Sequence, residues 1–307
     1  MAKTRKHPAL SRPLLLPMGL LACLAVPAQG ITFSAGLENS QWYEAGSIFE
    51  CSLTHRIPGY GNAVFYQRAG EPLSFYLDPV HNSMRPGRAA LVIEAPQWRG
   101  GQSVTDLGYV DVKDQGHPIE VTTAHSENML ASLGQGMAPT FTRRARHSDE
   151  PVRVRLTNIN FTPRYQQFRQ CTQGLLPVNF HQVERTRLLY PLNQEGLSNS
   201  GKRALDQVAL YIRADDRVKA VYVDGHTDSL GRRIHNRALS RERAQEVTAY
   251  LVSQGVPEEM ISTRYHGERY PVAGKPGNHP ENRRTTVRLE RLGDDGQMTS
   301  AGANITD

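Results

Sequence analysis

Two side chains of opposite charge, Asp228 and Arg243, lie close together in the sequence and could hold a ligand that carries both charges. A carboxylate such as that of Asp228 only accepts hydrogen bonds and suits an ammonium group. The planar guanidinium of Arg243 can hold a carboxylate through two parallel hydrogen bonds. The sequence predicts that Ser240 caps a helix and that Arg243 lies in its first turn, where free N–H groups favour a carboxylate. The pair therefore predicts a site for a zwitterion.

The stretch around this pair resembles the OmpA-like peptidoglycan-binding family. The family pattern is Thr-Asp, ten residues, Leu-Ser, two residues, Arg-Ala, two residues, Val, three residues and Leu, and this chain keeps every spacing. The matching positions are Thr227-Asp228, Leu239-Ser240, Arg243-Ala244, Val247 and Leu251, and Asn282-Arg283-Arg284 matches the family's Asn-Arg-Arg. The resemblance covers about residues 181–293, and a match of several residues at fixed spacing is a specific one.

The resemblance implies that Asp228 and Arg243 hold diaminopimelate, the cross-linking residue of Gram-negative peptidoglycan, with Asn236 in support. The end of the diaminopimelate side chain carries an ammonium and a carboxylate on one carbon, which fits the pair. The other positions expected to bind peptidoglycan are Thr227, Leu239, Asn282 and Arg283. The chain departs from the family at Tyr265, where a Gly is frequent, and at Thr285-Thr286, which replace an apolar strand start.

Other interpretations of the same residues remain open. An isolated Asp–Arg pair is most often a surface ion pair that stabilises by less than ~1 kcal/mol. His226 could be a base or a metal ligand, but no HExxH or Cys cluster accompanies it, so neither a metal nor a cofactor is expected. Asn282-Arg283-Arg284 could contact the stem peptide or lie at a sheet edge.

A wall-cleaving enzyme would need a metal triad, a Cys–His pair or two poised carboxylates. None has the right spacing, so no catalytic residue is predicted.

The second half of the chain alternates helix and strand, which predicts an α/β sandwich with helices on one face of a small sheet. Leu205, Val208, Ala209 and Ile212 form one stripe of an amphipathic helix. The other expected elements are strands at Val218–Val223 and Val287–Leu289 and a helix at Ser240–Val252. The polar, Gly-rich residues 294–307 predict a flexible tail.

Residues 31–180 predict a mostly antiparallel β domain, so the fold class is α+β. The expected strands are bounded by turn residues and lie at Ile48–Ile57, Ala63–Gln67, Leu73–Leu77, Ala89–Ala95, Ile119–Ala124 and Val152–Leu156. A short helix is expected at Ser126–Leu133, and the segment Phe168–Pro191 is expected to form the transition to the second domain.

The stretch Ile31–Asp78 resembles the N-terminal domain of the MotY family of flagellar motor proteins, and the placement of Cys51 and Cys171 is similar. The resemblance implies a periplasmic T-ring component of the flagellar basal body. In that family the first domain docks on the basal body and on the partner MotX. The second domain anchors the assembly to the cell wall, so that the stator units stay fixed. The alternative is a general outer-membrane tether unrelated to motility.

Residues 1–30 have the layout of an export signal, with four basic residues before an apolar stretch and a small-residue cleavage site. Leu20-Leu21-Ala22-Cys23 also resembles a lipobox, whose Cys would be acylated. Export to the oxidising periplasm favours a disulfide between the remaining Cys51 and Cys171, although two separate buried thiols are the alternative.

The net charge argues against a nucleic-acid partner. The whole chain carries a formal charge of +6, and removing the four basic residues of the signal leaves +2. Such a small excess of positive charge does not indicate binding to a polyanion as highly charged as DNA. The excess lies in the second half, which suits a weakly anionic polymer as well as a solvated surface.

Overall fold

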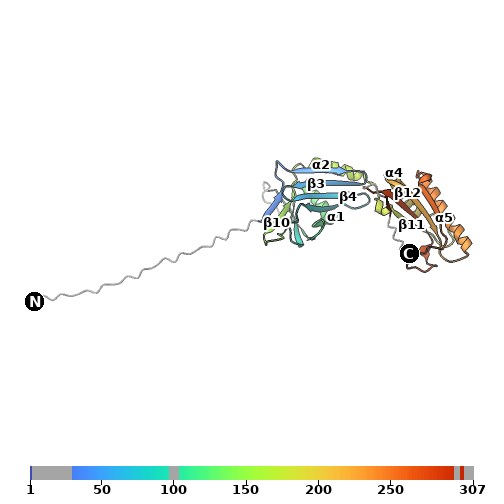
Figure 1. Ribbon diagram of the computed structural model, residues 1–307. Helices are drawn as coiled ribbons and strands as arrows, with labels where there is room; N and C mark the ends of the chain where they lie inside the picture. The colour runs from blue at the N-terminus through green and yellow to red at the C-terminus, as the bar shows by residue number, and fades with distance from the viewer. Residues whose placement is uncertain (2–29, 97–103, 294–297, 301–307) are drawn as a thin grey trace.

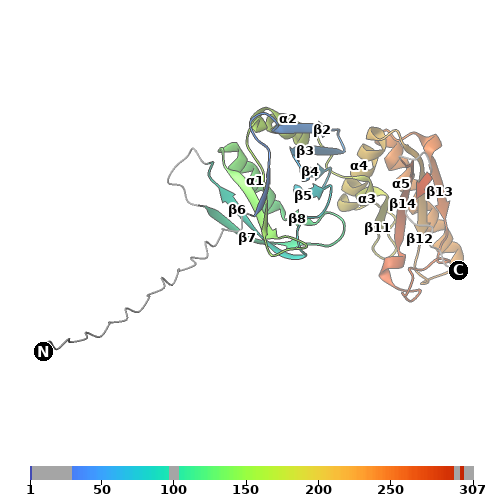
Figure 2. The same ribbon diagram turned by 60° about the vertical axis from the view of Figure 1, so that its left-hand side comes forward.

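The computed structural model describes Met1 and residues 30–96, 104–293 and 298–300, which form two domains arranged side by side (Figures 1 and 2). The predicted signal and the lipobox at Cys23 lie outside the described residues. None of the helices in the described part of the chain is long and apolar enough to cross a membrane.

The first domain is a curled sheet of ten strands in the order β1-β10-β9-β6-β7-β8-β5-β4-β3-β2. Every neighbouring pair is antiparallel except β1 with β10, which confirms the expected β-rich domain. Its elements are β1 Ile31–Ser34, β2 Gln41–Gly46, β3 Glu50–Ile57, β4 Gly61–Arg68, β5 Ser74–Pro79, β6 Gly87–Glu94, β7 Thr105–Val112, β8 Ile119–Val121, α1 Thr123–Gly134, β9 Ala138–Arg144, β10 Pro151–Arg155 and α2 Phe161–Gln173.

Helix α2 closes the first domain and was not expected from the sequence, which placed the start of the transition inside it. Phe161 and Phe168 on this helix are buried in the first core, and the ring of Phe161 meets that of Trp42 edge-on at 5.0 Å. The helix also carries Cys171, which forms a disulfide with Cys51 of β3 and so confirms the expected bond. The bond joins α2, at the end of the domain, to β3 across 120 residues of chain.

The second domain contains a five-stranded sheet in which β11, β14, β12 and β13 are neighbours and β15 pairs with β14. Its elements are α3 Phe180–Val183, β11 Arg185–Leu189, α4 Asn199–Ala214, β12 Val218–His226, α5 Arg233–Ser253, β13 Ile261–Tyr265, β14 Arg284–Leu292 and β15 Met298–Ser300, with 3₁₀ turns η1 Glu258–Met260 and η2 Pro280–Asn282. The predicted stripe of α4 is buried, which confirms the amphipathic helix.

Two expected boundaries differ from the structure. Val178 and Phe180 pack in the core of the second domain, so this domain begins a few residues before the predicted position 181. The predicted tail is not entirely irregular, because Met298–Ser300 pair with Glu290–Leu292. Strand β11 covers β14 only as far as Arg288, and β15 satisfies backbone groups of β14 beyond that point. Residues 294–297 and 301–307 lie outside the described part.

Helix α5 begins at Arg233, so the prediction that Ser240 caps it and that Arg243 lies in its first turn was wrong. The Ser240 hydroxyl is buried inside the helix, where it donates to Arg237 O at 2.9 Å and accepts from Gly267 N at 3.0 Å. A Ser whose side chain binds a neighbouring loop thus gives the same sequence signal as a cap. The helix packs closely on β12 at Gly225, where an added Cβ would lie 2.1 Å from Ser240 O.

We expect loss of the disulfide to destabilise the first domain. Cys51→Ala and Cys171→Ala should each lower the free energy of unfolding by about 2–5 kcal/mol, because the bond restricts a long loop of the unfolded chain. The double variant should lose no more than either single variant. Thermal unfolding followed by circular dichroism measures this, and a melting temperature that is insensitive to both substitutions would count against it.

We expect Gly225→Ala to destabilise the second domain, because the new methyl group overlaps backbone of α5 and the helix must move away from the sheet. Overpacking of this kind costs about 1–3 kcal/mol. Gly196→Ala is the matched control, since no atom lies within 4 Å of a Cβ built there. Equal melting temperatures for the two variants would contradict the close contact.

Candidate functional site

The predicted binding residues gather at one end of the second sheet. Strands β11, β12 and β13 end here and β14 begins here, so side chains that are far apart in sequence meet. Asp228 follows the end of β12, and Arg243 reaches the same place from the third turn of α5. Arg243 donates to His226 O, two residues before Asp228. It also stacks on the Tyr190 ring, and Arg283 donates to the carbonyl of the same tyrosine. The structure thus brings Asp228, Arg243 and Arg283 together.

Asp228 is buried, with 4% of its surface exposed, and forms an ion pair with Arg283 rather than with Arg243. Its Oδ2 accepts from Arg283 Nη1 at 3.0 Å, and its Oδ1 accepts from Leu230 N at 3.3 Å. Arg283 is itself fixed, because its Nε donates to Tyr190 O at 3.1 Å. A carboxylate has about four acceptor positions, so Asp228 retains capacity for an ammonium group.

The Arg243 side chain is completely buried and is held by backbone carbonyls. Its Nε and Nη2 donate to Gln194 O at 2.9 and 2.6 Å, its Nη1 donates to His226 O at 3.2 Å, and the guanidinium stacks on the Tyr190 ring at 4.5 Å. Burial lowers the pKa of Arg243 from its usual value. The Nε and Nη2 atoms, which could bind a carboxylate through two hydrogen bonds, therefore already bind the carbonyl of Gln194. The sequence did not predict this contact.

Asn236 supports the loop that carries Asp228. Its Nδ2 donates to Asp228 O at 3.2 Å and to Glu268 Oε2 at 2.6 Å, and the side chain is buried. Thr227 is also buried, and its Oγ1 has no hydrogen-bond partner among the described residues. Leu239 is partly buried on α5, one turn before Arg243.

Asn282 does not fit the prediction that it binds a ligand. Its side chain is completely buried and its amide is already used, because Oδ1 accepts from Val272 N at 2.7 Å and Nδ2 donates to Pro276 O and Gly277 O. Gly277 O in turn accepts from Ser229 N, next to Asp228. Asn282 therefore positions the loop beside the site, and Arg283 is the member of the Asn-Arg-Arg motif that reaches Asp228.

His226 is a buried neutral ring in this arrangement. It stacks on His266 with ring centroids 4.9 Å apart, and burial lowers its pKa to about 3. Within the described residues no group of three or more His, Cys, Asp or Glu side chains could hold a metal ion.

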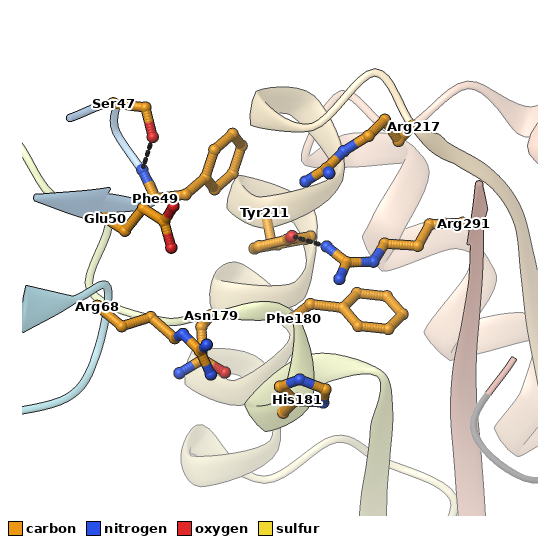
Figure 3. A pocket seen from close by; sticks show the side chains of 10 residues that line it. All are labelled: Ser47, Phe49, Glu50, Arg68, Asn179, Phe180, His181, Tyr211, Arg217 and Arg291. Carbon is orange, nitrogen blue, oxygen red and sulfur yellow. Dashed lines mark hydrogen bonds between the residues drawn. The ribbon is translucent and has the colours of Figure 1, made fainter. Parts of the chain in front are cut away.

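A hollow that the sequence did not indicate lies where the two domains meet (Figure 3). It has a volume of about 390 Å³ and is lined by Ser47, Phe49, Glu50, Arg68, Asn179, Phe180, His181, Tyr211, Arg217 and Arg291. Phe49 of the first domain faces Tyr211 of the second at 5.8 Å, and Arg291 lies over the Phe180 ring. The buried Asp215 accepts hydrogen bonds from Tyr211 and Arg217.

The joint between the domains is also held by α3. The Asn179 side chain caps this short helix and at the same time donates to Ala69 O and Glu71 Oε1 of the first domain. Gln182 completes the capping box and donates to Gly70 O at 3.1 Å. The only signal in the sequence was the pattern Asn-x-x-Gln, which is typical of a helix start and does not reveal a contact with another domain.

Comparison with known proteins agrees with this architecture. Residues 33–177 match the MotY N-terminal domain and residues 189–285 match the OmpA family. The sodium-type flagellar protein MotY of Vibrio parahaemolyticus is 30% identical over 285 residues, which span 89% of this chain and 95% of that protein. Outer membrane protein A of Atlantibacter hermannii is 38% identical over 95 residues, which span 31% of this chain and 39% of that protein.

Among solved structures, the OmpA-like domain of FopA1 from Francisella tularensis matches with a TM-score of 0.33 and 22% identity, over 38% of this chain and 75% of that one. The two matched families are structural, so the chain is not an enzyme. It belongs to the MotY family of flagellar proteins and carries an OmpA-like peptidoglycan-binding domain in its C-terminal half.

Proposed function

We propose that this protein is a periplasmic T-ring component that fixes the flagellar stator units to the cell wall. The second domain binds diaminopimelate of the peptidoglycan stem, and the first domain docks on the basal body and on a MotX-like partner. The observation that carries the proposal is the meeting of Asp228, Arg243 and Arg283 at the end of the second domain that lies away from the joint.

The charges of the site suit the zwitterionic end of diaminopimelate. The ammonium group pairs with Asp228. This carboxylate accepts one hydrogen bond from Arg283 and has further acceptor positions, because a carboxylate can accept several hydrogen bonds. The ligand carboxylate takes the place of Gln194 O on the Nε and Nη2 atoms of Arg243, where two parallel hydrogen bonds can form. Asn236 and Asn282 hold the two loops in position and do not contact the ligand.

The mechanical requirement agrees with this arrangement. A stator must not turn with the rotor, so its load has to reach a stiff layer, and peptidoglycan is the stiff layer outside the inner membrane. Strand β12 begins beside Arg217, which lines the joint, and ends beside Asp228. One strand therefore runs from the joint between the domains to the wall-binding site.

We expect Asp228→Asn to weaken binding to peptidoglycan about tenfold or more, because a charge-assisted hydrogen bond contributes about 1.5–3 kcal/mol. Co-sedimentation of the purified mature protein with isolated sacculi measures this, and Arg243→Ala should behave in the same way. Arg241→Ala is the control, since this exposed residue lies on the same helix. If all variants pellet like the wild type, the wall-binding site is not at Asp228.

Docking at the flagellar base and binding to the cell wall can be measured separately in cells. A motile strain that carries Asp228→Asn should retain the protein at the flagellar base, because docking depends on the first domain, but should swim poorly. Fluorescence microscopy and swimming assays measure the two effects. Loss of the protein from the flagellar base would show that docking requires the wall-binding site, contrary to the proposal.

A further inference from the structure

The second sheet has one face that α4 and α5 leave uncovered. Alternate residues of a strand point to opposite faces, and Val221, Val223 and Gly225 of β12 face the helices. The intervening residues point to the uncovered face. We name this surface the basic face, because its arginines are Arg185 and Arg187 of β11, Arg264 of β13, and Arg284 and Arg288 of β14.

The carboxylates of the basic face lie on one side of it. Asp224 accepts two hydrogen bonds from Arg264, at 2.8 and 2.9 Å, and Glu290 lies 3.6 Å from Arg288. On the β11 side the charges are not balanced in this way. Arg187 lies 3.6 Å from Glu281, whereas no described carboxylate lies within 4.0 Å of the Arg185 or Arg284 guanidinium.

The arginines on the β11 side are crowded together. Arg185 lies directly opposite Arg288 in the register of β11 and β14, and like charges in that position destabilise a sheet. Arg284 lies four residues before Arg288 on β14, opposite Leu189 at the end of β11, and Arg187 lies between the two pairs. Burial lowers the pKa of Arg284, and the charges of Arg187 and Arg185 lower it further. Such crowding is relieved when an anion lies between the guanidinium groups.

Arg284 also has an unused donor. Only 9% of its surface is exposed, its Nη2 donates to Tyr270 O at 3.0 Å, and its Nη1 has no partner among the described residues. Buried polar atoms in folded proteins nearly always have a hydrogen-bond partner. An unpaired guanidinium nitrogen beside two other arginines therefore points to a site for an anion.

The basic face and the site at Asp228 meet at the end of the sheet where β14 begins. Arg283 reaches Asp228, and the next residue, Arg284, points to the opposite side of the strand. Exposed apolar side chains flank this end of the face, at Leu189 with 54% and Tyr270 with 58% of the surface exposed. An extended peptide held at Asp228 could thus lay its next carboxylate against Arg284 and its small apolar residues against Leu189 and Tyr270.

We propose that Arg185, Arg187 and Arg284 form a second subsite, which binds a free carboxylate of the peptidoglycan stem peptide next to the diaminopimelate end held at Asp228. This inference rests on the proposed function and specifies how much of the stem the domain recognises. The carboxylate forms charge-assisted hydrogen bonds with the arginines and neutralises the crowded positive charge.

Isothermal titration of the full mature chain with a soluble disaccharide-tetrapeptide of the diaminopimelate type tests the subsite. Arg185→Gln with Arg187→Gln removes two exposed charges and should weaken binding about tenfold, with a smaller difference at high salt. Lys202→Gln with Arg203→Gln removes two exposed charges from α4 and should leave the affinity unchanged. A ligand whose glutamate carboxyl group is amidated should bind the wild type about tenfold more weakly and the Arg185/Arg187 variant no more weakly than before.

The outcomes separate the subsite from the proposed function. If the Arg185/Arg187 variant binds like the wild type while Asp228→Asn does not bind, the subsite is wrong and the wall-binding function stands. If Asp228→Asn also binds like the wild type, the proposed function itself is wrong. Binding to phosphatidylglycerol vesicles is measured in parallel. If the Arg185/Arg187 variant binds the muropeptide like the wild type but no longer binds the vesicles, the face binds phosphate and the stem-peptide proposal is overturned.

Discussion

The close contact between α5 and β12 at Gly225 is the constraint on which the binding site depends. Any side chain at this position would overlap the backbone of Ser240, so the helix reaches its place only beside a glycine. In that place Ser240 binds the Gly267 loop, Asn236 holds the backbone of Asp228, and Arg243 reaches the His226 carbonyl. One backbone contact thus sets the positions of the acidic and the basic parts of the site.

Burying the Arg243 charge requires that partners surround it, and this requirement explains the loops of the site. An unpaired buried guanidinium would be very costly. The Gln194 carbonyl and the Tyr190 ring supply partners from the segment that follows β11, while Arg283, the residue before β14, neutralises Asp228. The free protein is therefore stable without a ligand. In the proposed function, the ligand carboxylate competes with a backbone carbonyl for Arg243 and does not enter an empty site.

Period-two and helical patterns, which are local signals, predicted a β-rich domain followed by an α/β domain, and the export signal favoured the disulfide. The site residues Asp228, Arg243 and Arg283 were predicted by the resemblance to the OmpA-like family, whose motif spacing this chain keeps. The sequence was insufficient where a residue serves a distant element. The Ser240 hydroxyl resembles a cap in sequence but binds the Gly267 loop, which only the tertiary fold brings near. The Asn282 amide resembles a ligand contact in sequence but binds backbone groups of the loop that precedes it. Helix α2 was missed because its two buried aromatic residues are separated by polar ones. The contact between the two domains was not predicted, because no local sequence pattern indicates it.

Binding of two muropeptides that differ only at the third residue of the stem tests the central claim most directly. Diaminopimelate carries a carboxylate on the carbon that bears its terminal ammonium group, whereas lysine has the ammonium group alone. If Asp228 and Arg243 hold this zwitterion, titration of the mature protein should give at least about tenfold tighter binding to the diaminopimelate form. Equal affinity for the two forms would contradict the account, because the carboxylate assigned to Arg243 would then contribute nothing.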